Sequence, residues 1–328
     1  MLSRRAFSTA LASGLALPFA HPSWAQSGQD IRNAVQTMSQ LHSIQVRRGD
    51  DLLVSEAPRG PGLDRQANIK SCSKSIVALL LGTSISRGEI ANVDARLGDV
   101  APGLIPGGAD TGVADITMED LVTLRAGLER TSGANYGGWV SSGNWVADAL
   151  SRPMIAKPGA RMLYSTGSTH VLGAALTEAT GASLLALVRA RLGDPMGFDV
   201  PPWTRDPQGY YLGGNEMALT PRAMLKLALL MRDQGAFDGR QIVARDWIDA
   251  SITPRARSPY SGMSYGYGWF LTRSGYVLAR GYGGQVIAAH SRRGLAIAIT
   301  SDPTQPARSG GYFGDLVRLL DGPVLNLA

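Results

Sequence analysis

Runs with the composition of β-strands lie at both ends of this 328-residue chain, and a long stretch of helical pattern separates them. Near the beginning, residues 43–47 and 52–56 alternate around a Gly-Asp-Asp turn at 49–51, which predicts a β-hairpin. Past Pro254, short β-prone runs follow at 267–272, 276–280, 285–290 and 295–301. Strands from both ends could share one antiparallel sheet. The sequence therefore predicts a mixed α/β (α+β) fold.

The middle of the chain reads as helices joined by glycine-rich loops. A capping-box pattern begins at Thr117, and Thr220-Pro221 has the proline expected in the first turn of a helix. We expect one domain over residues 26–328. Its α/β part comprises residues 26–94 and 255–328, and its helical part comprises residues 95–254.

The first 25 residues have the features of an export signal. Arg4 and Arg5 form a twin-arginine pattern, a short apolar stretch follows, and small residues precede a cleavage point before Gln26. The apolar stretch is too short to span a membrane, and no later stretch could do so. We therefore expect a periplasmic or secreted protein, exported by the twin-arginine route.

Composition excludes several classes of function. The net charge of +6 comes from scattered residues, without a basic run or aromatic platform, so nucleic acid is not an expected partner. The single cysteine, Cys72, excludes an intramolecular disulfide, and no Cys/His cluster has metal-ligand spacing. We expect no metal, no cofactor and no obligate protein partner. Cys72 itself is expected to be a small buried residue.

Lysine is scarce, and one of the chain's four lysines closes the run Ser71-Cys72-Ser73-Lys74 at the start of an apolar helix. Residues three apart lie on one face of a helix, so Ser71 and Lys74 are predicted to be neighbours. A buried lysine can lose its proton, and a neutral amine beside a hydroxyl can activate it as a nucleophile. Chance and a capping serine beside a solvated lysine are the alternatives, because the motif alone is weak.

Two further stretches strengthen the interpretation: residues 158–167, with Tyr164 near their end, and the glycine-rich run 281–285. With Ser71 and Lys74, they occur in the order and at the separations of the serine β-lactamase and penicillin-recognising superfamily. The chain resembles the class C-like branch, which includes esterases, D-aminopeptidases and nylon-oligomer (6-aminohexanoate-dimer) hydrolases. The resemblance extends over about residues 30 to 325.

The resemblance implies a role for each matching residue. Ser71 would be the acylated nucleophile, Lys74 its base or proton relay, and Tyr164 a shuttle of protons to the leaving group. Lys74 would supply the positive charge that helps Tyr164 to ionise. The oxyanion hole would combine the backbone N–H groups of Ser71 and Gln285. The two glycines that let a substrate carbonyl approach would be Gly283 and Gly284.

Two positions depart from the family pattern. Thr166 stands where many members have asparagine, and Tyr282 stands where β-lactamases have a carboxylate-binding lysine and many esterases a histidine. Both are predicted pocket residues, and Tyr282 favours a neutral ester or amide over a β-lactam. Tyr136 and Trp139, in a glycine-rich loop, are further candidates for the pocket wall, with ordinary packing the alternative for each.

The expected function is hydrolysis of a small ester or amide through an acyl-enzyme on Ser71, without a cofactor. A β-lactamase or D-peptide peptidase is the alternative within the same class of enzyme. A non-catalytic cell-wall or ligand-binding relative is the alternative from another class.

Overall fold

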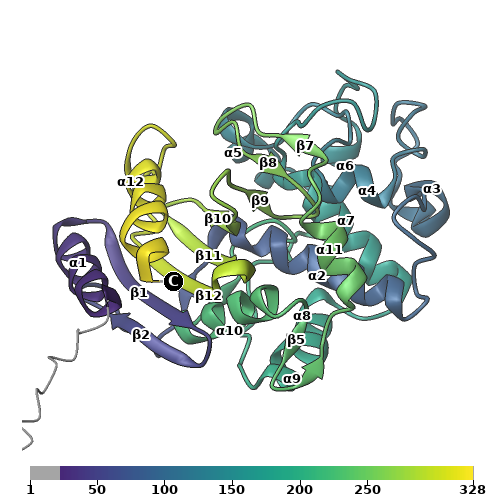
Figure 1. The fold of residues 1–328 in the computed structure, drawn as a ribbon. Coiled ribbons are helices and arrows are strands. Elements are labelled where there is room, and N and C mark those ends of the chain that lie inside the picture. The colour runs from purple at the N-terminus through teal and green to yellow at the C-terminus, as the bar shows by residue number, and fades with distance from the viewer. Residues whose placement is uncertain (1–22, 328) are drawn as a thin grey trace, which may run out of the picture.

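An eight-stranded antiparallel sheet forms the centre of the computed structural model, which describes residues 23–327 (Figure 1). The strand order is β2-β1-β12-β11-β10-β9-β8-β7. The bounds are β1 Leu41–Arg48, β2 Asp51–Glu56, β7 Ala256–Arg257, β8 Ser264–Tyr265, β9 Phe270–Leu271, β10 Val277–Gly281, β11 Gln285–His290 and β12 Leu295–Ser301. Strands from the two ends of the chain thus share one sheet, which confirms the predicted fold class.

Strand β1 joins the two ends of the chain. It pairs with β2 in the predicted hairpin, and its other edge pairs with β12, with Ile44 opposite Ile299. Strand β9 is shorter than the predicted run and pairs with only the first two residues of β10, Val277 and Leu278. The second half of β10 therefore has no strand on that side, and this free edge borders the site described below.

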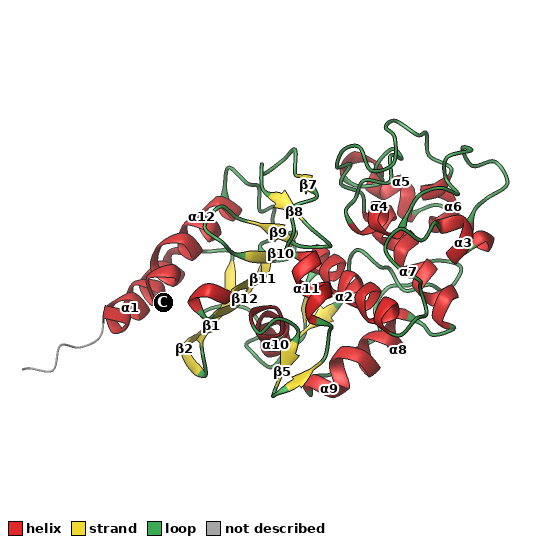
Figure 2. Ribbon diagram, turned by 45° about the vertical axis from the view of Figure 1, so that its right-hand side comes forward, coloured by secondary structure: helices red, strands yellow, loops and turns green. Residues whose placement is uncertain are grey.

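The two faces of the sheet differ in side-chain size. On one face, Ala289, Ala296 and Ala298 belong to the core that includes α10 (Pro221–Arg232). Their small side chains let α10 lie close to β11 and β12. On the other face, larger residues such as Ile297 pack against α1 (Ser23–Thr37) and α12 (Tyr312–Leu319). Figure 2 shows the helices on both sides of the strands.

The remaining helices lie mostly beside the sheet, on the right of Figure 1. They are α2 Ser73–Ser86, α3 Leu97–Val100, α4 Met118–Val122, α5 Tyr136–Val140, α6 Trp145–Leu150, α7 Thr166–Thr180, α8 Leu184–Val188, α9 Asp194–Met196 and α11 Arg245–Ser251. Two-stranded pairs are formed by β3 Ala67–Asn68 with β4 Ala218–Leu219, and by β5 Ala236–Phe237 with β6 Arg240–Gln241. Helix α10 falls in the range predicted for the helical part but packs on the sheet.

The predicted caps are present. Thr117 and Asp120 form the reciprocal capping box before α4, and the Thr220 side chain accepts a hydrogen bond from the Ala223 N–H in the first turn of α10. The expected export signal falls almost wholly on residues 1–22, outside the described residues. Within residues 23–327 no single helix is long and apolar enough to cross a membrane, although the bent pair Thr166–Thr180 and Leu184–Met196 passes that test together.

Candidate active site

Ser71 lies in a short 3₁₀ turn, Lys70–Cys72, that leads directly into α2. Lys70 has a left-handed backbone with φ of 50°, an uncommon conformation for a lysine. Asn68 supports this turn, since its side-chain oxygen accepts the Lys70 N–H at 2.9 Å. Glu216 binds the Lys70 ammonium at 3.0 Å and also accepts from the Asn68 amide. The turn that carries Ser71 is thus held through both its backbone and its side chains.

Lys74 is buried, and its Nζ atom has three oxygen neighbours: Ser71 Oγ at 3.3 Å, Thr166 Oγ1 at 3.3 Å and the Gly214 carbonyl oxygen at 2.6 Å. None of them is a carboxylate. Burial lowers the pKa of Lys74 to about 7, because the lost hydration of its charge outweighs the opposing influence of the neighbouring Cys72 thiol. A neutral Lys74 would donate to Gly214 and Thr166 and keep its lone pair for the Ser71 proton.

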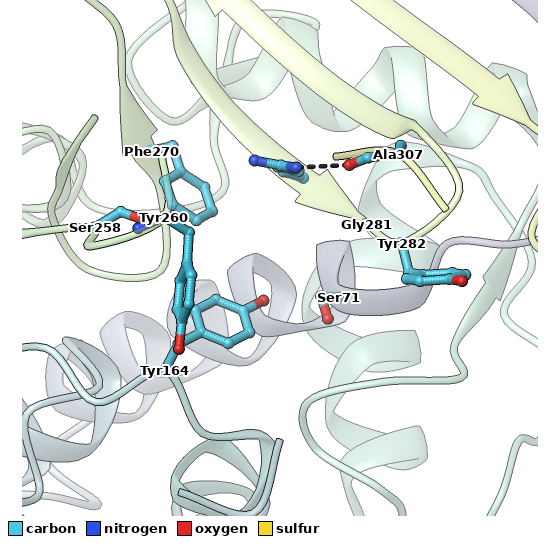
Figure 3. Close-up of a pocket in the computed structure, with 9 residues that line it drawn as sticks. Ser71, Tyr164, Ser258, Tyr260, Phe270, Gly281, Tyr282 and Ala307 are labelled. Carbon is cyan, nitrogen blue, oxygen red and sulfur yellow. Dashed lines mark hydrogen bonds between the residues drawn. The ribbon is translucent and has the colours of Figure 1, made fainter. Parts of the chain in front are cut away.

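Tyr164 lies beside Ser71 and Lys74. Its hydroxyl points toward Ser71 in Figure 3, and Lys74 Nζ is 5.1 Å from the centre of its ring. Burial raises the pKa of Tyr164, while the hydrogen bond with Ser71 and the positive charge of Arg280 oppose that rise. The sequence predicted Lys74 as the source of this charge. The structure places a second cation, Arg280, near the tyrosine as well.

These groups open into a cavity of about 240 Å³ at the edge of the sheet. Figure 3 shows Tyr164 and Tyr260 on one side of Ser71 and Tyr282 on the other. Tyr260 and Tyr282 are both more than half exposed, at 57% and 53%, so they form the rim. The cavity is lined by Ser71, Tyr164, Ser258, Tyr260, Phe270, Arg280, Gly281, Tyr282 and Ala307.

The predicted oxyanion donor at Gln285 requires correction. Gln285 is fully buried, opposite Gly281 in the β10–β11 ladder, and its side chain bonds to Ser301. The half of β10 that has no strand beside it borders the site instead. Tyr282, in the turn directly after β10, is exposed there. Neither the Ser71 nor the Tyr282 N–H donates a backbone hydrogen bond within residues 23–327. These two N–H groups are therefore the candidate oxyanion donors.

The glycines of the hairpin have different tasks from those predicted. Gly283 and Gly284 are buried, and a Cβ on either would collide with Asp302 or Tyr312, so they shape the turn and do not face a substrate. Gly281 is the glycine that permits a close approach. A Cβ there would lie 2.3 Å from the Ile69 carbonyl oxygen, so the lack of a side chain lets β10 pass close to the turn that carries Ser71.

Trp139 was predicted to line the pocket, and this is wrong. It is fully buried against Trp145 and Leu212, and its indole N–H donates to the Trp145 carbonyl, so it cannot reach a solvent-open cavity. Tyr136 lies outside the cavity lining, where its hydroxyl accepts a hydrogen bond from Asn215. Thr166 is buried beneath the cavity as a partner of Lys74.

A buried network behind Lys74 was not found from the sequence. The imidazole of His170, on α7, bonds through Nε2 to Asp206 at 3.0 Å and accepts the Gly213 N–H at Nδ1. Gly214, the next residue, supplies the carbonyl that holds Lys74. The pair therefore fixes a loop that positions the lysine. Spacing gives no signal for it, because the two residues are 36 positions apart.

Cys72 is a fully buried thiol whose Sγ lies 3.5 Å from the Gln285 carbonyl oxygen, and burial raises its pKa far above its usual range. It is the small packing residue that the sequence predicted, and it sits behind the nucleophile. Within residues 23–327 no group of three or more His, Cys, Asp or Glu side chains is placed to hold a metal ion.

A serine at a helix start, a buried lysine one turn later and a tyrosine facing both define a serine-hydrolase type of site on a sheet-and-helix fold. The Beta-lactamase family model matches residues 44–320, and the chain belongs to this family. The resemblance stated from the motifs is therefore confirmed.

Named relatives agree with this assignment. Esterase EstB of Burkholderia gladioli is 31% identical over 186 residues, which is 50% of this chain and 45% of EstB, so the chain spans less than half of that relative. The solved structure of EstCE1, a hydrolase with promiscuous acyltransferase activity, has a TM-score of 0.74 at 15% identity, covering 92% of this chain and 98% of EstCE1. A D-stereospecific amidohydrolase from Streptomyces has a TM-score of 0.67 at 17% identity, covering 90% and 98%. The two structures establish likeness of fold.

Proposed function

We propose that this chain is a serine esterase or amidase that works through an acyl-enzyme on Ser71. The observation that carries the proposal is the position of Lys74, with Nζ 3.3 Å from Ser71 Oγ, in a buried setting that lowers its pKa to about 7. Such an amine is partly neutral near pH 7 and can take a proton from a hydroxyl within hydrogen-bond reach.

Acylation would begin when the Ser71 hydroxyl passes its proton to Lys74 and its oxygen attacks the substrate carbonyl carbon. The carbonyl oxygen would become an oxyanion, held by the N–H groups of Ser71 and Tyr282. When the carbon–heteroatom bond breaks, the leaving group would take a proton through Tyr164, whose hydroxyl lies beside Ser71. The products of this half-reaction are the free alcohol or amine and an ester on Ser71.

Deacylation would use the same groups in reverse. A water molecule would lose a proton to the Lys74–Tyr164 pair and attack the ester carbonyl, and Ser71 would recover its proton as the acid departs. Lys74 and Tyr164 exchange the proton as a coupled pair, so neither alone is the base.

The rim residue at position 282 is a tyrosine, so this position has no lysine for the carboxylate of a β-lactam. EstB, the named relative at 31% identity, is an esterase. A β-lactamase or D-peptide peptidase would share the chemistry with a different substrate. A non-catalytic binding protein would have no use for a buried lysine held against a serine.

A fluorophosphonate probe and a substrate panel test the proposal. The wild-type protein should be labelled at Ser71 and should hydrolyse short 4-nitrophenyl esters faster than a reporter cephalosporin. The Ser71→Ala variant should lose both labelling and turnover, by a factor of about 10⁶ in kcat. Absence of labelling in the folded wild type would favour the binding protein, and faster cephalosporin turnover would favour the β-lactamase.

We also propose that the protein is exported by the twin-arginine route, on the basis of Arg4 and Arg5 and the short apolar stretch that follows. Replacing both arginines with lysine should trap the full-length chain inside the cell. Fractionation of a producing bacterium would show this, and unchanged export of the variant would contradict the proposal.

A further inference from the structure

Arg280 is the cation of the cavity that the proposed mechanism does not consume. It lines the cavity together with Ser71 and Tyr164 and lies at the free edge of β10. Its guanidinium donates to Ser309 Oγ at 3.0 Å and to the Ala307 carbonyl oxygen at 2.7 Å, the dashed line in Figure 3. Both acceptors are neutral.

The ring of Phe313 covers one face of the guanidinium, with 3.6 Å between Arg280 Cζ and the ring centre. An arginine has five N–H donors, so two bonds leave three of them without an acceptor among the described residues. The contacts hold the guanidinium flat and in place while much of its hydrogen-bonding capacity remains unused.

Two other partly buried arginines of the chain, by contrast, are neutralised by carboxylates. Arg191 holds both oxygens of Glu89 at 2.8 and 2.9 Å, and Arg125 binds Glu119 at 3.0 Å. No acidic side chain within residues 23–327 forms an ion pair with Arg280. Its charge is therefore uncompensated, and burial lowers the pKa of Arg280 to about 10.

We propose that Arg280 is a substrate-binding residue, and that the site prefers esters or amides that carry a carboxylate. This inference rests on the proposed function and names the substrate class of the same site. A rigid guanidinium with free N–H groups matches the two oxygens of a carboxylate, and charge-assisted bonds of this kind are the strong ones. Position 282 lacks the lysine of β-lactamases, and the cavity's permanent positive charge lies instead at position 280.

Matched ester pairs test the preference. For the acyl side, mono-4-nitrophenyl succinate and glutarate are compared with 4-nitrophenyl butyrate and valerate. For the leaving-group side, 4-acetoxybenzoate is compared with its methyl ester. The wild type should favour the anionic member of at least one set by about tenfold or more in kcat/KM, the effect of one hydrogen bond to a charged group.

The Arg280→Gln variant should lower kcat/KM for the preferred anionic ester by about 10- to 100-fold, mainly through KM. The neutral ester should change less, and through kcat, because only the influence of the Arg280 charge on Tyr164 is lost. Arg280→Lys keeps the charge without the planar fork and should retain part of the preference. Arg308→Gln is the matched control, because it removes an exposed arginine from the neighbouring loop and should leave the preference intact.

Binding without turnover separates this inference from the proposed function. In Ser71→Ala, calorimetric titration with mono-4-nitrophenyl glutarate should show binding that Arg280→Gln removes, whether or not the wild type turns the ester over. Equal kcat/KM for anionic and neutral esters, or an equal loss for both in Arg280→Gln, would overturn the inference and leave Arg280 a packing residue of the 307–309 loop.

Discussion

Two partly buried cations beside the cavity, Lys74 and Arg280, differ in their partners from two partly buried arginines elsewhere in the molecule, Arg191 and Arg125. Beside the cavity, Lys74 and Arg280 have only neutral oxygens as hydrogen-bond acceptors. Away from the cavity, Arg191 is bound by both oxygens of Glu89, and Arg125 by Glu119. The same chain therefore has carboxylates available and places none against the two cavity cations.

This difference distinguishes charges that stabilise the fold from charges that serve the proposed reaction. A paired charge recovers part of its lost hydration and ties two elements together, whereas an unpaired one is destabilising unless it loses its proton or meets a ligand. In the proposed mechanism, Lys74 gives up its proton and Arg280 keeps its charge for a substrate. Changes at the cavity should therefore alter activity more than stability, and changes at the paired arginines should do the reverse.

Lys74→Arg should have the largest effect of the changes considered for this comparison. Arginine keeps the positive charge but does not give up its proton, so kcat/KM for a 4-nitrophenyl ester should fall by about 10³-fold. Lys157→Arg, at an exposed position, is the matched control and should behave as wild type. Near wild-type turnover by Lys74→Arg would remove Lys74 from the proton relay.

Tyr164→Phe should follow, with a loss of about 10²-fold in kcat, because the leaving group would no longer receive a proton from the phenol. The unfolding midpoint in urea should change little. Tyr210→Phe, which removes a hydroxyl bound to Glu178, should not alter kcat. A Tyr164→Phe enzyme with unchanged kcat would show that the proton reaches the leaving group by another path.

The pH profile of the wild type should report Lys74 directly. Burial lowers the pKa of Lys74 from 10.5 to about 7, so its amine is neutral above this pH and protonated below it. The value of kcat/KM should therefore rise with pH up to about 7, by roughly tenfold per unit on the acid side, and then level off. A profile that is flat from pH 5 to 8 would contradict the base role.

Glu89→Gln tests the paired region and should have the smallest effect on activity. It leaves Arg191 with a neutral partner at a site where the two side chains are 11% and 22% exposed. The free energy of unfolding should fall by about 1–3 kcal/mol in urea denaturation, with kcat/KM unchanged. A drop in kcat/KM without a loss of stability would break the proposed division between the regions.

Much of the fold could be predicted from the sequence because its signals are local. The turn residues at 49–51 and the caps at Thr117 and Thr220 each act within a few positions, and the structure contains all of them. The spacing of Ser71 and Lys74 also acts locally, through one turn of helix. Tyr164 was placed by family resemblance, and the structure brings it beside both.

The remaining features of the site depend on tertiary contacts, which the spacing of residues along the sequence does not indicate. Gln285 was assigned to the oxyanion hole by family resemblance, but it is buried opposite Gly281 in the ladder, and the free edge of β10 borders the site instead. Arg280 is one arginine in an arginine-rich chain, and its place in the cavity lining beside Ser71 and Tyr164 sets it apart, which only the folded structure shows. The loop carbonyl of Gly214 and the pair behind it are positioned by tertiary packing alone.

The pairing of β1 with β12 also has a consequence for the order of folding. Ile44 cannot find Ile299 until the ribosome has made nearly the whole chain, and Ser71 meets Gly281 and Tyr282 only then. Contacts of such long range are slow to form. Until they form, β1 lacks the partner on its inner edge and is open to wrong pairings. On the proposed mechanism, Ser71 would therefore lack its oxyanion partner until the C-terminal strands have joined the sheet.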